Sequence, residues 1–223
     1  MEEIKIQSLN VRVWTKEISI FKPHFWLWRT FKQALLFHRE SPDVICLQEV
    51  EKPIGKFLLG LWNYKTFWGN TRLPIFVKKK YAKHCNIWAH LGGTRAENGH
   101  GFTGVKFGDT IIKNCHFSWT TEDIKYEYSK GWRKNMIFCG DMNVSKDRFI
   151  YNLKEYAGLS EDTFVVYPKT PEGPTYISYA EPFKYQEDID QFGYIGDNPP
   201  DAEVTVLPDK VSDHFSILAK ISA

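Results

Sequence analysis

The sequence of 223 residues carries little net charge and has no long hydrophobic run. Its 29 Lys and Arg nearly balance 27 Asp and Glu, which argues against a protein held to nucleic acid by bulk charge alone. Charged residues interrupt the first thirty positions, so we expect neither a signal peptide nor a membrane-spanning helix. We therefore expect a cytoplasmic protein with no membrane partner and no obligate protein partner.

Cysteine is scarce as well. The four cysteines, Cys46, Cys85, Cys115 and Cys139, lie far apart and form no C-x-x-C pair. This spacing disfavours a zinc knuckle or a redox motif. Three of them lie within apolar runs, so we expect buried free thiols rather than disulfides.

No linker or repeat divides the chain, and its 43% hydrophobic residues suffice for a substantial core. Hydrophobic periodicity predicts helices at 25–39, 53–62, 120–131 and 146–157. Alternating or short apolar runs predict strands at 3–9, 43–48, 64–68, 74–78, 86–91, 101–107, 110–119, 135–139, 175–180, 188–196, 202–207 and 215–221. We predict a single domain over residues 1–223, in which helices cover the outer faces of sheets.

Polar side chains end several predicted strands. Asn10 follows the first strand, Glu49 the second, and Asp141 the strand at 135–139. Carboxylates that border strands are costly to desolvate unless they are paired or coordinate a metal, so we expect one shared polar site. The complete set is Asn10, Glu49, His116, Asp141, Asn143, Asp190, Asp213 and His214.

This set suits hydrolysis of a phosphate ester. Mg²⁺ prefers oxygen ligands, and phosphoryl transfer needs positive charge near the phosphoryl oxygens and a positioned water. No Cys or His pair has zinc-ligand spacing. Taken singly, Asn10 could cap a turn, Glu49 could begin a helix, and His116 could be a core histidine. Independent structural accidents would not produce the whole ordered series.

Six ordered segments resemble the signatures of the exonuclease/endonuclease/phosphatase superfamily, which includes deoxyribonuclease I and apurinic/apyrimidinic endonucleases. The segments are SLNVRVW, ICLQEV, NCHFSW, FCGDMNV, EDIDQFGYI and VSDHFSI, and the similarity spans residues 4 to 221. The resemblance implies an α/β fold, namely a four-layer αββα sandwich of two mainly antiparallel sheets with outer helices. It also implies a metal-dependent phosphodiesterase or phosphatase site at one edge.

The resemblance implies that Glu49 is the principal ligand of Mg²⁺ (or Mn²⁺), with Asn10 and Asp213 nearby. Asp188 departs from the family pattern, because many relatives have a basic residue before the Ile-Asp pair. This departure leaves the local phosphate contacts open.

The same resemblance implies the catalytic roles. Asp141 and Asn143 position or deprotonate the attacking water. His214, oriented by Asp190, contacts the scissile phosphate, and His116 binds a phosphate oxygen.

A basic segment is the candidate substrate-binding surface. It comprises Arg72, Lys78, Lys79 and Lys80 and is interleaved with aromatic residues. It could contact a phosphate backbone, or it could be a solvated hairpin end whose lysines discourage edge pairing. Four tryptophans could line a groove or pack the core: Trp62, Trp68, Trp119 and Trp132. Five histidines lack a motif and are expected in surface or structural roles: His24, His38, His84, His90 and His100.

These features favour a metal-dependent phosphoesterase whose substrate is a phosphodiester bond in nucleic acid. One alternative is a phosphatase or phosphodiesterase that acts on a small molecule, a lipid head group or a phosphoinositide. Another is an inactive nucleic-acid-binding module, which would have no need of the full set of polar residues.

Overall fold

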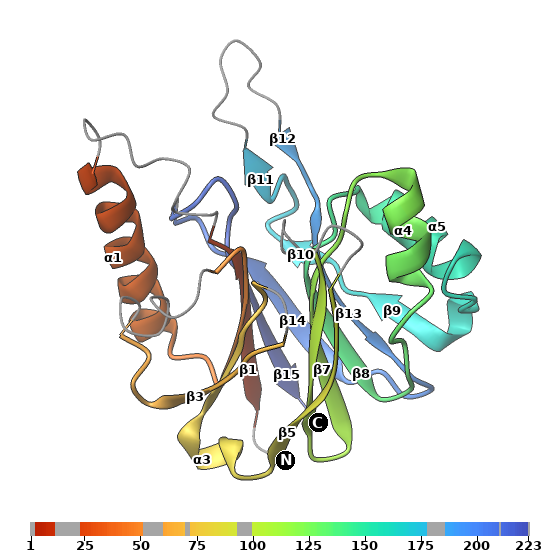
Figure 1. The fold of residues 1–223 in the computed structure, drawn as a ribbon, viewed down its shortest axis with the longest axis horizontal. Helices are drawn as coiled ribbons and strands as arrows, with labels where there is room; N and C mark the ends of the chain where they lie inside the picture. The colour runs from red at the N-terminus through yellow and green to blue at the C-terminus, as the bar shows by residue number, and fades with distance from the viewer. Residues whose placement is uncertain are drawn as a thin grey trace.

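Two β-sheets face one another in the computed structural model, and helices cover their outer surfaces (Figure 1). The structure describes residues 3–11, 23–50, 60–69, 72–92, 100–177, 186–209 and 211–222. None of the helices in these ranges is long and apolar enough to cross a membrane.

The first sheet contains, in spatial order, β10 (Lys169–Thr170), β14 (Asp201–Val206), β15 (Ile217–Ser222), β1 (Ile4–Asn10), β2 (Val44–Gln48), β4 (Ile75–Lys78) and β3 (Tyr64–Phe67). The second contains β5 (Cys85–Gly92), β6 (Gly101–Phe107), β7 (Thr110–His116), β8 (Met136–Asp141), β13 (Asp190–Ile195) and β9 (Phe164–Val166). A separate ribbon pairs β11 (Tyr176–Ile177) with β12 (Gln186–Glu187). Most described pairings are antiparallel, and the parallel ones are β1 with β2, β7 with β8, and β10 with β14.

Alternation along the strands separates three apolar layers. Ile6, Cys46 and Cys139 point between the sheets. Leu36 and Phe37 of α1 (Pro23–Glu40) pack on the outer face of the first sheet. The helices α4 (Thr121–Tyr128) and α5 (Lys146–Glu155) cover the second sheet. The predicted αββα sandwich is therefore confirmed, and the four cysteines are buried free thiols as expected.

The differences from the predicted elements concern short segments. The helix predicted at 53–62 lies largely outside the described residues, as does the end of the strand predicted at 175–180. The strand predicted at 110–119 ends at His116. The sequence did not indicate α3 (Lys79–Ala82), the 3₁₀ turn η3 (Glu161–Thr163), β9 or β10. Elements of two to four residues are too short for hydrophobic periodicity to reveal them.

Gly140 permits the close approach of β7 and β8 beside the polar strand ends. Its φ is +133°, and an added Cβ would lie 2.0 Å from the Cys115 carbonyl oxygen. Because that oxygen belongs to the backbone, no side-chain movement could relieve the clash. The glycine of the GDMN segment is thus required by the packing of the sheet.

We expect Gly140→Ala to lower the free energy of unfolding by about 3 kcal/mol or more, because the two strands must separate to accommodate the methyl group. Gly158→Ala is the matched control. Gly158 also has a positive φ, +68°, but nothing lies within 4 Å of its added Cβ, so only the left-handed penalty of about 1 kcal/mol remains. Urea denaturation measures both, and equal losses would contradict the clash.

Candidate active site

The register of the strands brings the predicted polar residues to one edge of the sandwich. Asn10 ends β1 beside Gln48 of the parallel strand β2. In the second sheet, Asp141 lies opposite His116 on one side and Asp190 on the other. Residues that are partners in register point to the same face of a sheet. The three side chains of the second sheet therefore project together toward the first sheet.

Asp141 is the centre of the resulting network. Its side chain is 2% exposed, and its Oδ2 accepts a hydrogen bond from Asn10 Nδ2 at 3.0 Å. The same oxygen lies 3.7 Å from His116 Nε2 and 3.6 Å from His214 Nε2. Asn10 Nδ2 also donates to Glu49 Oε1 at 3.0 Å. Burial raises the pKa of Asp141, while the charge of His214 opposes that rise.

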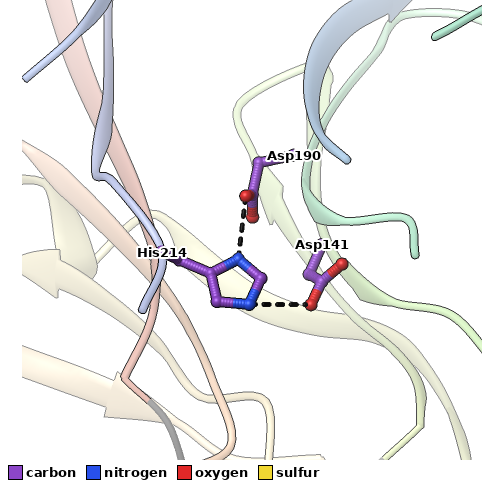
Figure 2. Close-up of side chains that lie close together, drawn as sticks. All are labelled: Asp141, Asp190 and His214. Atoms are coloured by element: carbon purple, nitrogen blue, oxygen red, sulfur yellow. Dashed lines mark hydrogen bonds and ion pairs between the residues drawn. The ribbon is translucent and has the colours of Figure 1, made fainter. Parts of the chain in front are cut away.

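His214 lies between two carboxylates, as Figure 2 shows. Its Nδ1 is 2.8 Å from Asp190 Oδ2, and its Nε2 faces Asp141. Burial lowers the pKa of His214, but the charges of Asp190 and Asp141 outweigh this effect and raise it to about 10. The imidazole is therefore positively charged throughout the neutral range.

Two buried residues that the sequence reasoning missed fix the backbone of Asp190. Thr175 Oγ1 accepts the backbone N–H groups of Ile189 at 3.1 Å and of Asp190 at 2.9 Å. Lys169 Nζ donates to the Asp190 carbonyl at 2.6 Å and forms an ion pair with Asp188. Asp188, which departs from the family pattern, is thus paired with Lys169 in this structure.

Asn143 and Glu49 both hold left-handed backbone conformations, with φ of +52° and +61°. Such conformations are uncommon for residues other than glycine and concentrate at functional sites. The Asn143 backbone N–H donates to Asp141 Oδ1 at 2.9 Å, and its Nδ2 donates to the Phe117 carbonyl at 2.7 Å. The turn after β8 therefore bonds directly to the central carboxylate.

Asp213 lies next to this network. Ser212 Oγ donates to Asp213 Oδ1 at 2.9 Å, and the charge of Asp213 contributes to the raised pKa of His214. The eight predicted residues are thus brought to one edge of the fold.

The donor set fits a hard divalent cation. Four carboxylates gather around two imidazoles, which leaves an excess of negative charge in a largely buried place. The Glu49 side chain is 23% exposed and so stands nearest to solvent. His214 already bridges Asp141 and Asp190 through its two nitrogens. Glu49, Asp213 and Asn10, the ligands that the resemblance implies, offer oxygens of the kind that such an ion prefers, and this assignment stays a prediction.

The basic segment is divided between the two ends of the first sheet. The Arg72 carbonyl accepts the N–H of Val50, so Arg72 lies next to Glu49. Lys78 lies at the other end of β2, where its Nζ donates to Asp43 at 3.1 Å and to the Ser41 carbonyl at 2.7 Å. The five residues of β2 span roughly 17 Å. Lys78, Lys79 and Lys80 therefore lie on a surface remote from Asp141. A substrate contact at these lysines stays a prediction.

His100 is a further site neighbour that the sequence reasoning placed among surface or structural histidines. It is 3% exposed, and its ring packs edge-on against the His116 ring with centroids 4.7 Å apart. The sequence contains a signal that places His100 near His116. A tight turn at Gly108-Asp109 pairs Phe107 with Thr110 and hence places residue 101 opposite His116.

We expect Asp190→Asn to lower the pKa of His214 by at least about one unit, because the imidazolium loses an adjacent carboxylate. Imidazole NMR titration of the metal-free protein measures this shift, and the exposed Asp197→Asn is the control. A raised histidine pKa stabilises the folded state below pH 6.5, and this contribution is lost as the pH rises toward 10. The wild-type protein should therefore lose more stability than the variant over that range, and equal losses would contradict the pairing.

Comparison with solved structures supports the same fold of two facing sheets. No protein-family model and no curated protein matches the chain. Truncated TDP2 from Caenorhabditis elegans is 16% identical, with a TM-score of 0.70 over 99% of this chain and 98% of that one. D. rerio TDP2 complexed with single-strand DNA product is 14% identical, with a TM-score of 0.70 over all of both chains.

A protein of the endonuclease/exonuclease/phosphatase family from Leptotrichia buccalis is 15% identical. It superimposes with a TM-score of 0.64 over 99% of this chain and all of that one. Likeness at such low identity establishes the fold. The chain therefore has the fold of the endonuclease/exonuclease/phosphatase superfamily, as its sequence motifs indicate.

Proposed function

We propose that this protein is a divalent-metal-dependent phosphodiesterase that hydrolyses phosphodiester bonds in nucleic acid. The observation that carries the proposal is the gathering of Asn10, His116 and His214 around one buried oxygen of Asp141. A binding module would have no need of an amide and two imidazoles converging on one carboxylate. The fold shared with endonuclease/exonuclease/phosphatase proteins supports the same reaction class.

Glu49, Asp213 and Asn10 would hold the metal, with Mg²⁺ or Mn²⁺ as the suited ion. A bound divalent cation supplies a Lewis acid that polarises a phosphoryl oxygen. Asn10 would also hold Glu49 in place, because its amide already bonds the Glu49 carboxylate. The left-handed backbone of Glu49 sets the direction in which this carboxylate leaves the end of β2.

Asp141 would position and deprotonate the attacking water. Its burial raises its pKa, and a carboxyl group of higher pKa is a stronger base. The backbone N–H of Asn143 holds the other carboxylate oxygen and so fixes the orientation of Asp141. Water attack needs such a fixed acceptor, because misplacement weakens proton transfer steeply.

His214 would stabilise the negative charge that develops on the phosphoryl oxygens. Asp190 keeps its imidazole protonated and oriented, so Nε2 presents a fixed positive donor. His116, at the end of β7, would bind a second phosphoryl oxygen. Its Nε2 already points at the carboxylates of Glu49 and Asp141, at 3.8 and 3.7 Å.

Nucleic acid is the favoured substrate because a solved neighbour that shares the fold over the whole chain, D. rerio TDP2, is described with a single-strand DNA product. Arg72, beside Glu49, adds a cationic side chain from the same end of the first sheet. These two observations support a polyanionic strand over a single small phosphate ester.

We expect the purified protein to cleave an oligonucleotide with Mg²⁺ or Mn²⁺ and to lose this activity with a chelator. Asp141→Asn and His214→Ala should each lower kcat at least about 100-fold, because each removes a group that acts on the water or the phosphate. Asp162→Asn and His84→Ala change exposed residues of the same types and should leave kcat unchanged. Metal-independent cleavage, or near-normal rates of both site variants, would contradict the proposal.

Substitutions in the two parts of the basic segment should weaken the binding of substrates of different length. Arg72→Ala should weaken binding of a dinucleotide and of a long single strand alike, because Arg72 lies beside Glu49. The double variant Lys79→Ala, Lys80→Ala should weaken only the long strand and reduce its salt slope by about 0.7 for each phosphate that a lysine no longer neutralises. Binding titrations at several salt concentrations measure both effects. An unchanged slope would leave the lysines as a solvated strand end.

A further inference from the structure

We propose that Trp119 is a stacking platform for the nucleobase next to the phosphate that is hydrolysed. This inference rests on the proposed phosphodiesterase function and names a residue that would select its substrate. The Trp119 side chain is 64% exposed, although a tryptophan offers the largest apolar surface of any residue. Core packing therefore does not account for it, in contrast to Trp132, which packs against Phe117 and Phe138.

A chain of ring contacts places Trp119 beside the candidate catalytic residues. The His116 ring meets the His100 ring at 4.7 Å with an interplanar angle of 90°. His100 in turn meets the Trp119 ring at 5.3 Å with an angle of 75°. Both histidines are only 3% exposed, so Trp119 is the outermost ring of a series that begins at the site.

The loop that carries Trp119 is held on both sides. The Ser118 backbone N–H donates to Glu127 Oε2 at 2.7 Å, and Ser118 Oγ donates to Asp123 at 3.3 Å. Thr120 Oγ1 donates to the same Asp123 oxygen at 2.6 Å. The exposed ring is thus presented by a backbone anchored to α4, so little conformational entropy is lost when a ligand stacks on it.

The same loop is hydrogen-bonded to the backbone of Asp141 and to the side chain of Asn143. The Phe117 N–H donates to the Asp141 carbonyl at 3.0 Å, and the Phe117 carbonyl accepts from Asn143 Nδ2 at 2.7 Å. A single residue, Ser118, therefore separates Phe117, which bonds the candidate catalytic turn, from Trp119. A ring held in this way has a fixed position relative to the phosphate that Asp141 and His214 would serve.

The chemistry of an exposed indole favours an unpaired or terminal base. A base within a duplex is stacked on both of its faces, whereas a base in a single strand or at an end offers a free face to an aromatic side chain. Stacking is tolerant of base identity, because every base has a π-face. We infer a substrate with a single-stranded or frayed end and no strong sequence preference.

The test compares two phosphodiesters, a single-stranded oligonucleotide and a strand of the same length built of abasic residues, which has no base and no other aromatic ring. Trp119→Ala should raise KM for the oligonucleotide about 5- to 150-fold more than it raises KM for the abasic strand. Trp119→Phe keeps an aromatic face, so its KM for the oligonucleotide should lie close to the wild-type value. Trp62→Ala is the control, because Trp62 is also exposed, at 57%, but precedes β3 at the Lys78 end of the sheet.

A second readout does not depend on activity. With a chelator present, the oligonucleotide should quench the tryptophan fluorescence of the wild-type protein more than that of Trp119→Phe. It should quench the fluorescence of Trp62→Phe as much as that of the wild-type protein. The platform would be overturned, and the phosphodiesterase left intact, by two results together. These are an equal rise in KM for the two phosphodiesters in Trp119→Ala, and equal quenching of the wild-type protein and of Trp119→Phe by the oligonucleotide. Quenching that depends on Trp119 without any cleavage would support the platform and overturn the phosphodiesterase instead.

Discussion

The buried carboxylate of Asp141 is the constraint on which the rest of the site depends. A carboxylate removed from water costs several kcal/mol unless donors surround it. Its donors come from β1, through Asn10, and from the turn after β8, through Asn143. The two imidazoles come from β7 and from the segment before β15. The ends of distant segments must therefore meet at one point, and the sandwich is the frame that makes them meet.

A second polar layer lies directly below this network and joins the two sheets. Gln48 Nε2 donates to Asn114 Oδ1 at 2.6 Å and to Ser8 Oγ at 3.2 Å. Asn114 Nδ2 donates across the interface to the carbonyls of Leu47 at 2.8 Å and Pro74 at 3.1 Å. These bonds replace apolar packing where the carboxylates above would make it unfavourable. Cys46 and Cys139, which lie in register with Ser8 and Asn114, begin the apolar core.

Local patterns were sufficient for the site residues that end strands. The alternation in β1 and the GDMN turn after β8 put Asn10 and Asp141 at strand ends, and together they predicted one shared polar site. Residues whose roles depend on long-range pairing gave no such local signal. Thr175 and Lys169 bond the Asp190 backbone across intervals of 15 and 21 residues. The run of lysines likewise gave no indication that Asp43 would pair with Lys78.

The distribution of charge decides how such a site must hold an anion. Among the described residues, Lys169 is paired with Asp188, and His214 lies between Asp190 and Asp141. The positive charges of Lys169 and His214 at the candidate site are therefore already neutralised by the protein itself. The net charge of +2 adds no strong long-range attraction. Affinity must come from contacts made at short range. The proposed divalent ion on Glu49 and the proposed Trp119 platform beside His100 would supply two such contacts that need no basic surface.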